Sequence, residues 1–266
     1  MNSNVALIGF GEAGSTFAAG AGWGEQACGW DLLPARRATM QEIGVIAAPT
    51  ARDALAGAPV VLSLVTADQA LKAAQDYAPD LAPGALWCDM NSVAPETKRA
   101  AARAVEAAGG RYVDVAVLAP VEPARLQVPL LLAGPAAEAA AAALRTLGFG
   151  NVCVVGVDVG RASAIKMIRS VMVKGVEALT AEMMAAADAA GVADEVLASL
   201  DASEKVLSWA ERAAYNLERM TTHGLRRAAE MEESAKTLEA LGVAPLMTQA
   251  TVLRQRQSVE NKDSVA

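Results

Sequence analysis

Histidine and cysteine are scarce in this chain of 266 residues. His223 is the single histidine, and Cys28, Cys88 and Cys153 are scattered thiols without a Cys-x-x-Cys spacing. We therefore expect neither a histidine and cysteine zinc site nor a disulfide framework. A serine hydrolase is also disfavoured, because the chain has no Gly-x-Ser-x-Gly turn that would expose a nucleophile.

Positive charge and long apolar runs are also limited. The chain has 23 Lys and Arg residues and 30 Asp and Glu residues, which gives a formal net charge of −7. This negative charge argues against a protein that binds nucleic acid or a membrane surface. No apolar run reaches the roughly 20 residues of a membrane span. The first residues lack the cationic flank and cleavage site of a signal peptide. We therefore expect a cytoplasmic protein that acts on a small molecule, without nucleic acid, membrane or metal.

The first part of the chain alternates short β-branched runs with alanine-rich helical stretches. This alternation is typical of β-α-β units in a mostly parallel sheet. The predicted strands are residues 5–8, 27–30, 60–65, 86–89, 112–117, 130–133 and 152–155. The predicted helices between them are residues 13–21, 34–43, 67–77, 95–108 and 136–147.

From Gly160 onward the composition is helical, so we place a domain boundary at residue 158 and expect an all-helical domain over 159–266. The first helix is expected to run from Gly160 to about Ala190, with later breaks at Gly191, near Asp201, at Thr221 and at 242–245. One face of the first helix carries apolar residues at helical spacing, which predicts a buried seam that packs on a partner subunit. These residues are Ile165, Ile168, Met172, Val176 and Leu179.

The clearest motif is Gly9-Phe10-Gly11-Glu12-Ala13-Gly14, directly after the first strand and before a helix. In a dinucleotide-binding turn the first glycine makes the tight turn, the second lets the pyrophosphate approach, and the third lets the helix pack on the strand. The helix N-terminus supplies unpaired N–H groups to the anion. A glycine-rich turn without a ligand is the alternative, which this context disfavours. The fold predicted for residues 1–158 is therefore a doubly wound α/β Rossmann domain.

Asp31 ends the second strand about 20 residues after Gly9, where an acid binds the ribose hydroxyls of NAD. An acid here repels a 2′-phosphate, which favours NAD, but Arg36 and Arg37 follow on the next helix, so NADP stays open. The predicted cofactor-binding residues are Gly9, Phe10, Gly11, Glu12, Ala13, Asp31, Leu32, Arg36, Leu64, Val65, Thr66 and Asn91.

Hydride transfer needs a group that moves the accompanying proton. Lys166, Ser170 and Lys174 share one helix face by their spacing of four residues. A lysine that is desolvated beside a cofactor can exchange a proton with a substrate oxygen. The alternative is an ordinary solvated lysine, which the sequence pattern alone would favour.

Five segments together resemble the β-hydroxyacid dehydrogenase family, which includes 6-phosphogluconate and 3-hydroxyisobutyrate dehydrogenases. They are VALIGFGEAG (5–14), CDMNSVAPETK (88–98), YVDVAVLAP (112–120), GRASAIKMIRS (160–170) and the tail from His223 to Met247. The tail is similar to a branch with an uncharacterised C-terminal helical domain. The resemblance implies a homodimer formed through the helical domain, and hydride transfer that interconverts a hydroxy acid and its keto form. It also implies Lys166 as the general acid/base.

The match to the family's substrate residues is mixed. Asn91-Ser92 fits, but Leu118, Ala119 and Pro120 replace a Ser-Gly-Gly loop, Ser170 replaces an asparagine, and Ala229-Glu230 replaces a Lys-Asp pair. His223, Arg226, Arg227 and Glu230 share a helix face that is able to receive a carboxylate. A salt-bridged surface helix is the alternative. The predicted substrate residues are Ser92, Val117, Leu118, Ala119, Arg169, Ser170, His223, Arg227 and Glu230.

Two other functions stay open. The apolar Leu118-Ala119-Pro120 segment is compatible with a less polar ketone or an imine as substrate, although imine reductases of this superfamily often lack the lysine. A non-catalytic module that senses a dinucleotide is the second alternative.

Overall fold

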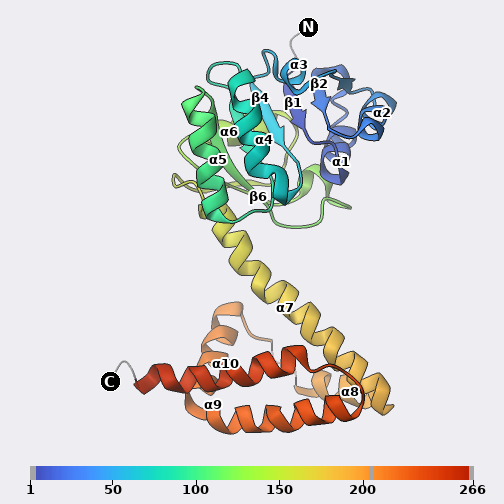
Figure 1. The fold of residues 1–266 in the computed structure, drawn as a ribbon, viewed down its shortest axis with the longest axis vertical. Coiled ribbons are helices and arrows are strands. Elements are labelled where there is room, and N and C mark those ends of the chain that lie inside the picture. Colours follow the sequence, from blue (N-terminus) through green and yellow to red (C-terminus); the bar gives the residue numbers. More distant parts are fainter. Residues whose placement is uncertain (1–3, 204–205, 264–266) are drawn as a thin grey trace. The chain divides into compact units, whose positions relative to one another are not determined.

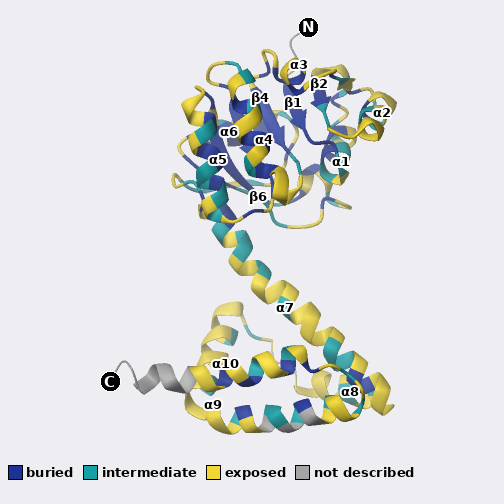
Figure 2. Ribbon diagram, in the orientation of Figure 1, coloured by how far each residue is buried: buried dark blue, intermediate teal, exposed yellow. Residues whose placement is uncertain are grey.

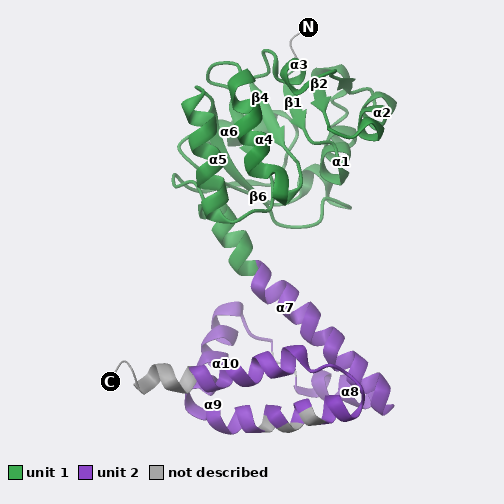
Figure 3. Cartoon of the chain, viewed as in Figure 1, with its two compact units in different colours: residues 1–169 green, residues 170–266 purple. Residues whose placement is uncertain are grey.

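A computed structural model describes residues 4–203 and 206–263. The chain divides into two compact units, Met1–Arg169 and Ser170–Ala266 (Figure 3). The division lies inside helix α7 (Arg161–Ala190) instead of at the predicted boundary after residue 158. Residues 161–169 of α7 belong to the first unit, and the Asp114 carboxylate holds the start of this helix by accepting hydrogen bonds from the backbone N–H groups of Gly160 and Ser163.

The first unit is built on one eight-stranded sheet with the order β3-β2-β1-β4-β5-β6-β7-β8. Figure 1 labels β1, β2, β4 and β6 of this sheet among the helices of the unit. The strands pair in parallel except where β7 runs antiparallel to β6, so the predicted mostly parallel, doubly wound sheet is confirmed. The strands are β1 (Val5–Ile8), β2 (Ala27–Trp30), β3 (Ile46–Ala47), β4 (Val60–Ser63), β5 (Leu86–Asp89), β6 (Arg111–Val117), β7 (Leu130–Ala133) and β8 (Val152–Gly156).

Helices cover both faces of this sheet. One core layer joins the sheet to α1 (Glu12–Ala21), α2 (Pro34–Glu42) and α6 (Ala137–Thr146), and the other joins it to α3 (Ala51–Leu55), α4 (Ala70–Tyr77) and α5 (Pro95–Ala107). Figure 2 shows the buried strands between them. The short 3₁₀ helices are η1 (Gly24–Gln26), η2 (Ala67–Gln69), η3 (Ala78–Asp80) and η4 (Arg125–Gln127).

Strand β1 shows how the sequence specifies these two layers. Val5 and Leu7 belong to one core layer, and Ala6 and Ile8 to the other, as the two-residue period of a strand requires. Because both faces are covered, the strand is apolar throughout instead of alternating. Proline at the first helical positions of α2 and α5 pre-sets the backbone angle and removes an N–H that would lack a partner in the helix.

The sequence analysis missed two short elements between α2 and β4. Strand β3 has two residues and α3 has five, too few to produce a visible hydrophobic period. Helix α3 is nevertheless signalled locally, because the Thr50 side chain accepts a hydrogen bond from the Asp53 backbone N–H at its start. Strand β4 also ends at Ser63, two residues before the predicted end.

The second unit is helical, as predicted. It contains the rest of α7, then α8 (Ala193–Ser203), α9 (Trp209–Ala240) and α10 (Leu246–Asp263), and α10 packs along α9. The predicted break at Thr221 is wrong, because α9 runs through it. The Thr221 hydroxyl donates to the Leu217 and Glu218 carbonyls of the preceding turn, so the helix accommodates this residue.

The apolar seam predicted on α7 is not buried within the chain. Ile168 is 73% exposed and Met172 is 48% exposed, and Ile165, Val176 and Leu179 are exposed as well. Only the distal part of this face meets apolar side chains of the described residues, because Val176 and Leu179 line a hollow together with Leu200 of α8. Among the described residues, no helix combines the length and the hydropathy that a membrane crossing requires.

Candidate active site

The glycine turn has the geometry of an anion-binding loop. Gly9 has a φ of +91°, and a Cβ there would lie 2.6 Å from the Leu64 carbonyl oxygen, so only glycine fits. A Cβ on Gly11 would meet nothing within 4 Å, which leaves open space above the second glycine. Gly11 is also the N-cap of α1 and provides no capping side chain. The first N–H groups of α1 therefore remain available for a ligand.

A hollow of about 440 Å³ opens beside this turn, at the carboxyl ends of β1, β2 and β4. The sheet order reverses between β1 and β4, and ligands of doubly wound folds bind at such a point. The hollow brings together eight of the predicted cofactor residues: Gly9, Gly11, Asp31, Leu32, Arg36, Leu64, Val65 and Thr66. It is also lined by residues that the sequence analysis missed, namely Trp30, Leu33, Gln69, Lys72, Ala73, Asp76 and Tyr77.

Asp31 joins the glycine turn to the end of β2. One carboxylate oxygen accepts the Phe10 N–H at 2.7 Å, and the other accepts the Leu33 N–H at 2.8 Å. The carboxylate is thereby fixed at the wall of the hollow, which Arg36 also lines. Phe10 is buried under the turn, while Glu12 and Ala13 form the first turn of α1 and do not line the hollow. The residues present thus fit a dinucleotide.

Asn91, the last predicted cofactor residue, lies in a buried network behind β5. Its side-chain amide donates to Ser63 Oγ at 3.0 Å and to the Asp89 carboxylate at 2.8 Å. Its carbonyl oxygen Oδ1 is buried and has no hydrogen-bond partner among the described residues. Asn91 therefore keeps one acceptor for a group that the structure does not contain.

Lys98 anchors this network. Its side chain is fully buried, and its ammonium lies 2.6 Å from the Asp89 carbonyl oxygen, 3.0 Å from the Asp89 carboxylate and 3.6 Å from the Asp114 carboxylate. The Asp114 carboxylate accepts from the N–H groups of Gly160 and Ser163 and from the Ser163 hydroxyl. One ammonium therefore ties the Asn91 segment to the N-terminus of α7.

Lys166 lies on the second turn of α7 and meets the segment after β5. Its Nζ lies 2.5 Å from Ser92 Oγ. One helical turn further, Arg169 donates to the Leu118 carbonyl oxygen, 3.1 Å away, at the end of β6. The structure therefore brings Ser92, Lys166, Arg169 and Leu118 together in the first unit.

Cys88 and Tyr112, two groups affected by the charge of Asp89, have raised pKa values and stay protonated. Burial, followed by the charge of Asp89, raises the pKa of the Cys88 thiol to about 12. Burial, with the charge of Asp89 next in effect, also raises the pKa of the Tyr112 hydroxyl, which donates to the Asp89 carboxylate at 2.6 Å. Neither group is therefore suited to accept a proton at neutral pH.

The remaining predicted substrate residues are spread more widely. Val117 ends β6 and is partly buried, and Ala119 is exposed just beyond it. Ser170 is the first residue of the second unit. His223 and Arg227 lie on α9 in that unit, and the Glu230 side chain lies outside the described residues.

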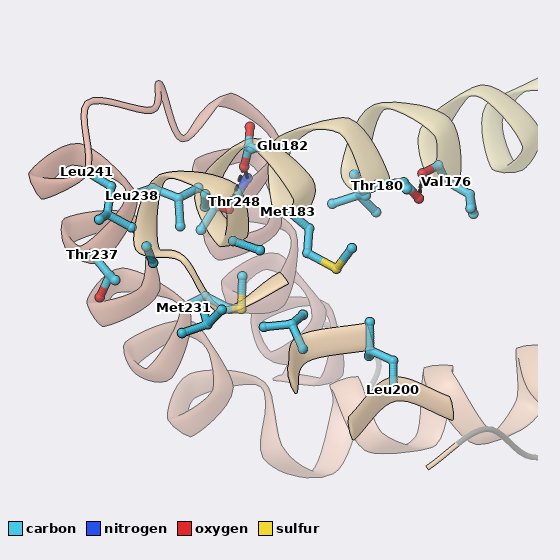
Figure 4. A pocket seen from close by; sticks show the side chains of 16 residues that line it. Val176, Thr180, Glu182, Met183, Leu200, Met231, Thr237, Leu238, Leu241 and Thr248 are labelled. Carbon is cyan, nitrogen blue, oxygen red and sulfur yellow. Dashed lines mark hydrogen bonds between the residues drawn. The ribbon is translucent and has the colours of Figure 1, made fainter. Parts of the chain in front are cut away.

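The second unit contains two hollows of different character. One of about 550 Å³ is mainly apolar, with Met183, Leu200, Met231 and Leu238 among its lining residues (Figure 4). Glu182 also lines it and accepts hydrogen bonds from the first residues of α10. The other hollow, of about 280 Å³, is lined by polar side chains of α9, including His223.

The sequence analysis missed Lys98, Asp89 and Asp114 as a unit. A signal was present, because Asp89 and Asp114 each follow buried apolar residues in a strand, and a buried carboxylate requires a partner. Lys98 cannot be assigned to them from spacing, since the contacts connect different elements. Among the described residues, no group of three or more histidine, cysteine, aspartate or glutamate side chains is placed to hold a metal ion.

The glycine turn, the acid that ends β2 and the hollow between them define a nicotinamide-dinucleotide-binding domain. Residues 4–157 match the family model described as the NAD binding domain of 6-phosphogluconate dehydrogenase. The chain therefore belongs to the 6-phosphogluconate dehydrogenase-like family of NAD(P)-dependent oxidoreductases. Residues 187–258 match a Domain of unknown function (DUF1932), in agreement with the resemblance of the tail.

Solved structures agree with this assignment. A conserved hypothetical protein from Sinorhizobium meliloti 1021 is 40% identical, with 96% of this chain and 88% of that chain covered and a TM-score of 0.64. A conserved protein of unknown function, described as structurally similar to 3-hydroxyacid dehydrogenases, is 30% identical, with 97% of both chains covered and a TM-score of 0.63. An imine reductase from Myxococcus stipitatus in complex with NAD+ is 22% identical, with 98% and 95% covered and a TM-score of 0.77, and shares the fold.

Proposed function

We propose that this protein transfers a hydride between a nicotinamide dinucleotide and a hydroxy acid or its keto form, with Lys166 as the general acid/base. The contact of 2.5 Å between Lys166 Nζ and Ser92 Oγ carries the proposal. It supports the proposal because an amine that can exchange a proton meets a hydroxyl in the segment that follows β5. The bound cofactor would supply or accept the hydride.

The proton steps fall to the chain's own residues. In the reductive direction the Lys166 ammonium donates a proton to the substrate oxygen, and in oxidation neutral Lys166 takes the hydroxyl proton. Ser92, held by its contact with Lys166, orients the substrate oxygen. The free carbonyl oxygen of Asn91 is suited to accept from an amide N–H group at the buried side of the site.

For the cofactor, we favour NAD over NADP. The Asp31 carboxylate is fixed at the wall of the hollow and is suited to accept from ribose hydroxyls, while it repels a 2′-phosphate. Arg36 lines the same hollow and supports the alternative, since a guanidinium binds phosphate well.

A second candidate is the reduction of a less polar ketone or an imine. Leu118 and Ala119 present apolar side chains where the family has a polar substrate loop, and the Arg169 guanidinium is already engaged by the Leu118 carbonyl. Lys166 favours carbonyl over imine chemistry. A dinucleotide-sensing module without turnover is the remaining alternative.

The test compares Lys166→Ala with Lys174→Ala, a change of a lysine two turns further along α7. Wild type is assayed with hydroxy acids, keto acids, ketones and imines against all four nicotinamide dinucleotides. We expect Lys166→Ala to bind NADH normally and to lose roughly 10²- to 10⁴-fold in rate, while Lys174→Ala keeps its rate. Full turnover by Lys166→Ala would refute the proposed role. Dinucleotide binding without turnover on any substrate would favour the sensing module.

We also propose that the protein is a homodimer formed through its helical unit. Val171, Met172 and Val173 expose apolar side chains along the part of α7 that belongs to this unit, with Val171 76% exposed. Exposed apolar surface of this extent is typical of an interface. Light scattering after size exclusion should give twice the mass of 27.3 kDa for wild type and for Lys174→Ala, and a reduced mass for Val171→Asp. A monomeric wild type would contradict the proposal.

A further inference from the structure

The polar hollow on α9 differs from the other hollows described above, because every residue that lines it is polar. The lining consists of Tyr215, Glu218, Arg219, Thr222, His223 and Arg226. These positions recur at three- and four-residue spacing, so their side chains stand on one face of the helix. A volume of about 280 Å³ is suited to a ligand of a few non-hydrogen atoms.

Tyr215 fixes the orientation of the Arg219 side chain. Its guanidinium lies over the tyrosine ring, 5.4 Å from the ring centroid, and its Nη1 donates to the tyrosine hydroxyl at 2.6 Å. This contact at Nη1 fixes the plane of the Arg219 guanidinium. The Nε–H group is buried and finds no acceptor among the described residues. A buried donor of this kind calls for an acceptor that the chain does not supply.

The charges around the hollow favour an anion. The lining contains two arginines, Arg219 and Arg226, and one carboxylate, Glu218. This local excess contrasts with the net charge of −7 for the whole chain. A guanidinium presents parallel N–H donors that match the oxygens of a carboxylate or a phosphate.

We propose that this hollow is a binding site for a small oxyanion, a carboxylate or a phosphate group, with Arg219 as its principal donor and His223 and Arg226 beside it. The site belongs to the second unit alone. It goes beyond the proposed hydride transfer, and its existence does not depend on that activity.

The single histidine makes the site directly observable. We would follow the imidazole C2–H resonance of His223 by proton NMR at a fixed pH of about 6.5, where an imidazole is sensitive to nearby charge. Sodium phosphate and sodium malonate are titrated separately against sodium chloride at constant ionic strength. We expect a saturable displacement of the resonance with at least one oxyanion and none with chloride. The comparison of phosphate with malonate identifies the preferred group.

Variants then assign the binding to Arg219. We expect Arg219→Met to weaken the binding about tenfold or more, because a charge-assisted donor is lost, and Arg219→Lys to restore it only in part. Arg254→Met removes the same charge from an exposed position on α10, outside the lining, and should leave the binding unchanged. If Arg219→Met lowers the helical content by circular dichroism, the exposed Arg226→Met takes its place.

A displacement that grows linearly with salt, or that is equal in Arg219→Met and Arg254→Met, would overturn the proposal. Because the titration uses neither dinucleotide nor turnover, this failure would leave the role of Lys166 untouched. Conversely, loss of the Lys166 proposal would leave a saturable oxyanion site in place.

Discussion

The Lys98 ammonium lies 3.0 Å from the Asp89 carboxylate, with both side chains buried between α5 and the sheet. The same ammonium reaches the Asp114 carboxylate, which holds the start of α7. Ser92 and Lys166, which meet at the candidate active site, are therefore positioned by chain segments that share one buried cation. The geometry of the candidate active site and the stability of the first unit therefore depend on the same contacts.

We expect Lys98→Met to destabilise the first unit by about 3–5 kcal/mol, because it leaves two buried carboxylates without their cation. Urea denaturation followed by tryptophan fluorescence measures the free energy of unfolding. Lys72→Met is the matched control. It removes an exposed ion pair with Asp76 on α4, which should leave the free energy of unfolding almost unchanged because solvent screens such a pair. Equal effects of the two changes would contradict the assignment of Lys98 as the anchor.

The sequence was sufficient for the elements whose signals are local. The strands before Gly9 and Asp31, the glycine turn and the long helix after Gly160 all follow from periodicity and turn chemistry. Strand β3 and helix α3 were missed because two and five residues do not produce a period. Helix propensity predicts a break at Thr221 because it neglects the hydrogen bonds that the Thr221 hydroxyl donates to the preceding turn.

The site was predictable to the extent that its parts follow strand ends. Asp31 and Leu64 come directly after parallel strands, Asn91 follows the end of another by two residues, and those ends meet at one edge of the sheet. The Lys98 network was not predictable, because which helix face turns toward which strand is decided by packing. The exposed seam on α7 illustrates the same limit, since the sequence pattern identifies an apolar face but not what covers it.

The preference for NAD predicts that substitutions of Asp31 and Arg36 affect the binding of different dinucleotides. Asp31→Asn should weaken NADH binding roughly tenfold or more, because a charged acceptor for ribose hydroxyls becomes neutral. Arg36→Met should leave NADH binding unchanged and weaken NADPH binding further. Fluorescence titration of each variant with both dinucleotides measures the dissociation constants. A wild type that binds NADPH more tightly than NADH would instead make Arg36 the determinant.

The three cysteines should differ sharply in reactivity. Cys28 and Cys88 are buried, Cys153 is exposed, and the pKa of the Cys88 thiol is raised to about 12, which leaves almost no thiolate at neutral pH. An aromatic disulfide reagent at pH 8 should therefore label one thiol rapidly in the native protein and three in urea. Cys153→Ser should abolish the rapid reaction. Rapid labelling that persists in this variant would show that the buried cysteines are accessible.

The stability of the helical unit should depend on Glu182. Its carboxylate accepts from the Met247 and Thr248 N–H groups at 2.7 and 2.9 Å and from the Thr248 hydroxyl, at the start of α10. Burial raises the pKa of Glu182, but these hydrogen bonds together lower it by more than burial raises it. The pKa of Glu182 in the folded protein therefore lies below the ordinary 4.5. The negative charge of Glu182 also lies near the positive, N-terminal end of the α10 dipole, which is a stabilising arrangement.

A lowered pKa in the folded state means that protons bind more tightly to the unfolded chain. The stabilisation by Glu182 is therefore fully present above pH 4.5 and is lost as the pH falls through the lower, folded-state pKa. We expect Glu182→Gln to be less stable than wild type at pH 7 and the difference to shrink below pH 4.5. Glu177→Gln, an exposed position on the same helix, serves as the control and should show no such pH-dependent difference. Thermal unfolding followed by helical circular dichroism across this pH range measures both differences in stability. If the loss of stability in Glu182→Gln does not change with pH, the carboxylate charge does not hold the start of α10.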